Sequence, residues 1–131
     1  MNVITRMAAA VALMMTMVLG VALAGNMEAR YGNTVVSTYP DGTVVKFFYN
    51  KDGTLSVKGT MGGKTTEATG KWRPDGANIC ITLSANMGIF EANKERCVPL
   101  NGDKVGDKWQ VPTKDASGKD IKVDVTIVAG R

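Results

Sequence analysis

From residue 31 onward, apolar and polar side chains alternate in short runs along the chain. In TLSVKGTM (54–61), Leu55 and Val57 fall on one face of an extended chain, while serine, lysine and threonine fall on the other. DIKVDVTIV (120–128) alternates in the same way. This period of two predicts strands with one buried and one solvated face. By contrast, TVVKFFYN (43–50) is apolar on both faces, which predicts a strand covered from both sides.

Asp-Gly pairs separate these runs, in PDGT (40–43), KDGT (51–54) and PDGA (74–77). This pair is favoured in hairpins, where a tight turn needs a residue with positive φ. No stretch after residue 24 shows a convincing helical period. We therefore predict an all-β domain, a small antiparallel up-and-down meander of seven or eight strands that closes into a barrel, with a sandwich as the alternative. The expected strands span about 31–38, 43–50, 54–61, 64–73, 77–84, 94–100, 107–112 and 119–128.

The first 24 residues read as a secretory signal peptide rather than as part of the fold. Arg6 precedes an unbroken, weakly hydrophobic run from Met7, rich in alanine and methionine, which ends in Ala22-Leu23-Ala24. A charged start, an apolar segment and a small-x-small cleavage site are typical of such signals. An uncleaved membrane anchor is the alternative, because 18 apolar residues are at the lower limit of a membrane span. We expect cleavage after Ala24 and a single secreted or periplasmic β domain over 25–131.

The chain has two cysteines, Cys80 and Cys97, and no histidine. In an exported protein two cysteines usually form a disulfide, which here would close a loop of about 18 residues and contribute about 3 kcal/mol. A zinc site needs three or four suitable ligands, and the missing histidines remove the commonest ones. We therefore expect a structural disulfide, no metal site and no cofactor.

Composition narrows the possible functions further. The formal net charge is +4, and the basic residues are dispersed among acidic ones, so no basic stripe for nucleic acid is expected. Without histidine, triads of the Ser-His-Asp or Cys-His type are excluded. Glycines mark turns rather than a phosphate-binding loop. These features favour a non-enzymatic protein.

Two groups of residues are candidates for binding. Met87, Ile89 and Phe90 form an apolar patch between the cysteines, and either fold back as a lid over the core or contact a partner from a loop preorganised by the disulfide. Trp72 and Trp109 either close the ends of the core or line a ligand cavity, since a barrel of this strand number can hold one small molecule.

The segment GKWRPDGANICITL, followed by RCVPL, carries a Gly-x-Trp, an Asp-Gly turn and a cysteine in each of two successive strands. In this pattern the chain resembles a loose group of small exported bacterial β-proteins. The resemblance covers about a third of the expected mature chain and implies export and a β fold, but no particular activity. Periplasmic inhibitors of lysozyme and of metalloproteases are similar in size and in having one disulfide, although their own motifs do not occur here.

Together these observations predict an exported, monomeric binding protein of the cell envelope. Its expected partner is a protein or envelope component, bound in the manner of an inhibitor through residues 85–95. The alternative is a lipocalin-like carrier of a small apolar ligand. We expect neither nucleic-acid binding nor stable membrane insertion after the signal is removed.

Overall fold

A computed structural model describes residues 26–131 of the chain. The predicted signal peptide and its cleavage site lie outside the described residues. One short 3-10 helix, η1 (Glu28–Arg30), precedes the strands. The strands are β1 (Thr34–Thr38), β2 (Val44–Tyr49), β3 (Thr54–Met61), β4 (Lys64–Asp75), β5 (Asn78–Leu83), β6 (Arg96–Pro99), β7 (Lys108–Lys114) and β8 (Asp120–Val128).

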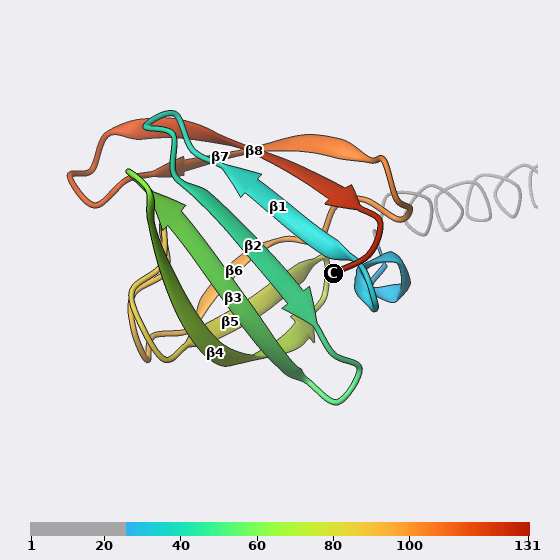
Figure 1. The fold of residues 1–131 in the computed structure, drawn as a ribbon. Coiled ribbons are helices and arrows are strands. Elements are labelled where there is room, and N and C mark those ends of the chain that lie inside the picture. Colours follow the sequence, from blue (N-terminus) through green and yellow to red (C-terminus); the bar gives the residue numbers. More distant parts are fainter. Residues whose placement is uncertain (1–25) are drawn as a thin grey trace, which may run out of the picture.

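The strands form one antiparallel sheet that curls into a nearly closed barrel (Figure 1). Their order is β6-β5-β4-β3-β2-β1-β8-β7, so each strand pairs with its neighbour in sequence except at one place. Pairing of β1 with β8 closes the meander, while β6 and β7 remain the two edges of the sheet. Across that gap the side chain of Arg96 donates a hydrogen bond to Thr113 Oγ1. The predicted meander and barrel are confirmed.

All eight predicted strands are present, with boundaries shifted by at most a few residues. The Asp-Gly turns form for the expected physical reason: Gly42 and Gly53 have φ of 90° and 88°, a region that residues with a Cβ rarely adopt. In these two turns the aspartate carboxylate also accepts a hydrogen bond from a backbone N–H two residues later, Asp41 from Thr43 at 2.9 Å and Asp52 from Thr54 at 3.0 Å. The turn chemistry in the sequence thus specifies the strand boundaries.

Inward-facing side chains fill the barrel and form one core. The expectation that residues 43–50 are covered from both sides is wrong. The outward Lys46 is exposed and Phe48 is only half-buried, because nothing within residues 26–131 forms a second layer over β2. Instead the C-terminal Arg131 places its guanidinium 6.0 Å from the Phe48 ring centre.

Different segments close the two ends of the barrel. The loop between β5 and β6 covers one end, which we call the lid end. At the other end, η1 lies beside the start of β1, and the connection from β6 to β7 passes next to it (Figure 1). We call this the arginine end, after the buried Arg30. No helix within residues 26–131 is long and apolar enough to cross a membrane.

Candidate functional site

At the lid end, Met87 and Phe90 are both buried at 5% exposure. Their backbones exchange two hydrogen bonds of 2.9 Å, which folds the segment into a tight turn. The Phe90 ring meets Phe47 edge-on, with ring centres 5.7 Å apart. Because the turn directs both side chains inward, they lie in the core as a lid.

Gly59 and Tyr39 shape the surface on which this lid packs. A Cβ on Gly59 would lie 2.2 Å from Met87 Sδ, so the methionine occupies space that only glycine leaves free. The Tyr39 hydroxyl accepts a hydrogen bond from the Ile89 N–H at 3.3 Å. Ile89 itself is half-buried against the core. Met87, Ile89 and Phe90 are therefore buried to different extents in the barrel interior. None of them is among the exposed large apolar residues.

The predicted disulfide between Cys80 and Cys97 is confirmed. The two residues are directly opposite each other on β5 and β6, on the outer face of the barrel. Asp75 lies close to the two sulfur atoms. Because each sulfur is bonded to the other, this group offers no thiolate to a metal ion.

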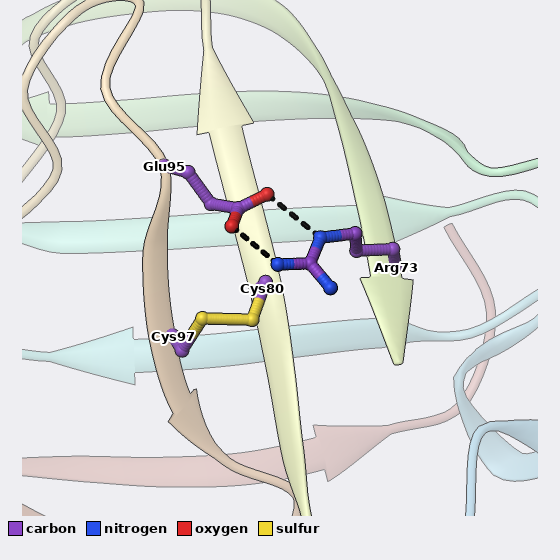
Figure 2. The surroundings of a disulfide bond; sticks show 4 residues. All are labelled: Arg73, Cys80, Glu95 and Cys97. Carbon is purple, nitrogen blue, oxygen red and sulfur yellow. Dashed lines mark hydrogen bonds and ion pairs between the residues drawn. A yellow bond between two sulfur atoms is a disulfide. The ribbon is translucent and has the colours of Figure 1, made fainter. Parts of the chain in front are cut away.

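An ion pair crosses the outer face beside the disulfide. The Arg73 guanidinium donates two hydrogen bonds to the Glu95 carboxylate, at 2.9 and 2.6 Å, and Figure 2 shows this pair next to the bridge. These hydrogen bonds lower the pKa of Glu95 and raise the pKa of Arg73. Both side chains are about half exposed, so the pair adds little stability, but it ties β4 to the segment that precedes β6.

At the arginine end, Arg30 is 2% exposed although it carries a full charge. Its guanidinium donates to the backbone carbonyls of Asn101 at 2.7 Å and Asn26 at 3.0 Å, with a longer contact of 3.5 Å to Gly102. It lies 5.5 Å from the centre of the Trp109 ring. These contacts fasten η1 to the connection between β6 and β7.

The electrostatic environment of Arg30 is unusual for a buried charge. Within residues 26–131 it forms no ion pair with a carboxylate, and its Nε is buried with no hydrogen-bond partner. Burial lowers the pKa of Arg30, while the neighbouring tyrosines, Tyr49 first, oppose this shift. Burial raises the pKa of Tyr49 to about 12. Buried charges usually have an ionic partner, and Arg30 has none among these residues. A negatively charged group could therefore pair with it.

Arg30 borders a cavity of about 50 Å³ inside the barrel. Most of the lining is apolar or aromatic and comes from strands all around the barrel. The lining residues are Arg30, Val35, Ser37, Tyr39, Phe47, Tyr49, Ile79, Ile81, Ile89, Phe90, Val98, Pro99, Trp109, Val111, Val123 and Val125. They include no carboxylate and no free thiol, so the cavity presents a cation and apolar walls without an acid–base pair.

The structure separates the two tryptophans that the sequence grouped together. Both lie at the arginine end, but only Trp109 lines the cavity. Trp72 packs against Tyr31 and Tyr49, with ring centres 6.1 and 6.2 Å away, and its Nε1 donates to Asn50 O at 2.8 Å. Trp72 therefore closes the end of the core.

Sequence reasoning did not identify Arg30 or Tyr49 as candidates. Arg30 stands between two short polar stretches, where an arginine is ordinarily exposed. Its burial depends on carbonyls 71 and 72 residues further along the chain. Tyr49 lies at the next inward position of β2 after Phe47. The alternation therefore predicts that it is in the core, but not that it lies near Arg30.

No protein-family model, curated protein sequence or solved structure significantly matches this chain. The resemblance to small exported β-proteins with a Gly-x-Trp pattern thus stays an expectation. The geometry of the barrel is the basis for a proposal on function.

Proposed function

We propose that this protein is an exported, non-enzymatic binding protein that holds a small molecule, or the apolar end of one, inside its barrel. The cavity of about 50 Å³ beside Arg30 and Trp109 is the observation that supports this proposal. Well-packed cores leave few voids larger than a water molecule, so a residual cavity bordered by a polar group is a candidate binding site. Export follows from the predicted signal peptide and accords with the disulfide.

The size of the cavity limits the ligand. Sites for drug-sized molecules usually measure roughly 300–1,000 Å³, several times more than this barrel offers. A ligand of a few heavy atoms fits the present volume. A larger one needs the edges β6 and β7 to separate, which would break the hydrogen bond from Arg96 to Thr113. The proposal is therefore a narrower form of the lipocalin-like carrier.

The alternative in which residues 85–95 bind a partner protein receives less support. Its apolar anchors would be Met87, Ile89 and Phe90, of which the first and last are 5% exposed. Exposing Phe90 to a partner would remove it from its edge-on contact with Phe47. A partner could still contact the exposed polar residues of this loop, such as Lys94.

Xenon provides a direct test, because it enters small apolar cavities without needing a polar partner. We expect xenon to shift the NMR signals of Val98, Val111 and Val123, which line the cavity, in protein expressed from the full chain. Val98→Phe should fill the space and abolish the shifts at Val111 and Val123. Val128→Phe is the matched control, because Val128 is exposed on the outside of β8. Unchanged signals in the wild-type protein would refute an accessible cavity.

A further inference from the structure

We propose that the ligand of the barrel carries a single negative charge, and that Arg30 binds it. The chemical class is a small monocarboxylate with a short apolar tail. This inference rests on the proposed function, since it places the ligand in the same cavity.

The first argument is charge balance. A buried charge is costly unless hydrogen bonds and an opposite charge compensate it. Arg30 is 2% exposed and, within residues 26–131, only backbone carbonyls accept its hydrogen bonds. Carbonyl dipoles satisfy donors but supply no net negative charge. An anion beside Arg30 would neutralise the site.

The second argument is geometry. A guanidinium has five N–H donors, and the Nε–H of Arg30 has no acceptor in the described part of the chain although it is buried. Arg30 belongs to the cavity lining and is its one charged residue, so its guanidinium is the charged group that an anion in the cavity would meet. A hydrogen bond between an ionised donor and a carboxylate is about twice as strong as a neutral one. The Trp109 ring, whose centre is 5.5 Å from the guanidinium carbon, adds a cation–π contact.

The rest of the lining defines the ligand class. One cation matches one negative charge, whereas a dianion such as a phosphate monoester would leave a buried negative charge unpaired. Beyond Arg30 the walls are largely apolar, including Val98, Val111 and Val123, which suits a hydrocarbon tail. The volume of about 50 Å³ restricts that tail to a few carbons.

Arg30 also has a structural role, because it fastens η1 to Asn101 and Gly102. A test must separate this role from ligand binding. Arg73 is a suitable control, since it is another arginine that joins two segments, through its hydrogen bonds to Glu95 on the outer face of the barrel. It lies outside the cavity lining.

The experiment compares propionate with propionamide, which have nearly the same shape but differ in charge. The protein is expressed from the full chain with Trp72→Phe, so that Trp109 is the only tryptophan and reports binding by fluorescence. We expect propionate to bind at least tenfold more tightly than propionamide. Arg30→Met should remove this preference, whereas Arg73→Met should retain it.

The outcomes distinguish this inference from the proposed function. Equal binding of propionate and propionamide, or a preference that survives Arg30→Met, overturns the role of Arg30, while binding of xenon still supports the cavity. Failure of both xenon and propionate to bind refutes the cavity as well. If Arg30→Met does not fold, the comparison of propionate with propionamide in the wild-type protein decides alone.

Discussion

The two ends of the barrel are closed by different chemistry. At the lid end, Met87 and Phe90 fill the interior with apolar contacts, and a glycine leaves room for the methionine. At the arginine end, η1 places the charged Arg30 against Trp109, and a cavity remains between the strands. The cavity is bordered by apolar lid residues such as Phe90 from one end and by the buried charge of Arg30 from the other.

Under the proposed function, the two ends of the barrel have different tasks. Apolar burial is the main favourable term in folding, so the lid end is where the loop adds stability. An uncompensated buried charge costs stability, and its retention beside a cavity is more consistent with binding. Variants at the lid end should therefore change the free energy of unfolding, and variants at the arginine end should change ligand preference.

The largest effect is expected at the lid. Phe90→Ala removes a buried ring from the core and leaves a cavity, so it should lower the free energy of unfolding by about 3–5 kcal/mol. Denaturant unfolding measures this loss. Glu91→Ala, at the exposed neighbouring position, is the control and should change stability little. A loss below about 1 kcal/mol for Phe90→Ala would contradict a lid that is packed as core.

The disulfide should rank second. Cys80→Ala combined with Cys97→Ala opens a loop that contains the whole lid, and the sequence separation of 17 predicts a loss of about 3 kcal/mol. Hydrogen exchange should increase first in residues 84–95, whereas the amides around η1 should keep their protection. Equal loss of protection at both ends would argue that the disulfide stabilises the whole barrel rather than the lid.

Alkaline pH should separate the two ends through their buried tyrosines. The pKa of Tyr49 is raised to about 12, so the folded protein keeps this proton at a pH where the unfolded chain, with a value near 10.0, loses it. The raised pKa of Tyr49 contributes fully to the free energy of unfolding below pH 10. This contribution, about 2–3 kcal/mol in total, is lost as the pH rises from 10 to 12. Denaturant unfolding between pH 9 and 12 measures this slope.

Tyr49→Phe should flatten that slope more than Tyr39→Phe. Burial raises the pKa of Tyr39 as well, but the hydrogen bond from the Ile89 backbone to its oxygen opposes the shift. An equal effect of the two variants would show that the two ends bury their hydroxyl groups alike.

The smallest effect is expected from crowding the seat of the lid. Gly59→Ala would place a Cβ within 2.2 Å of Met87 Sδ, and the flexible methionine can move only partly. We expect a loss of about 1–2 kcal/mol, as for other overpacked cores. Ser56→Ala, on the outward face of the same strand, serves as the control in thermal or denaturant unfolding. No difference between the two would mean that Met87 is loosely held.

Much of the fold could be predicted because its signals are local. Alternation around Leu55 and Val57 identified β3, and the Asp-Gly turns located its two neighbours. The cysteine pair was also readable, since only two cysteines occur. Local signals were less reliable for side chains whose burial depends on distant segments. Both faces of β2 read as apolar, yet the outward Phe48 is only half-buried, with Arg131 beside it.

The candidate site depended on contacts that no local pattern encodes. Met87, Ile89 and Phe90 could be recognised as an apolar patch, but their direction follows from the turn and from the space at Gly59. The tryptophans looked equivalent, although only Trp109 reaches the cavity. Which side chains converge in a barrel depends on register and closure, and these are decided by the whole sheet.

By itself the sequence determined the strands, the turns, the disulfide and the meander. Alternating burial and the positive φ of turn glycines are local properties, set within a few residues. The disulfide was determined because two cysteines allow only one pairing. Only the tertiary structure decided which end of the barrel is closed by apolar side chains and which by a buried charge. Arg30 illustrates the reason: its charge is visible in the sequence, but its burial against Trp109 and the carbonyl of Asn101 exists only once distant segments meet. A desolvated charge is a property of the folded surroundings, and not of the residue alone.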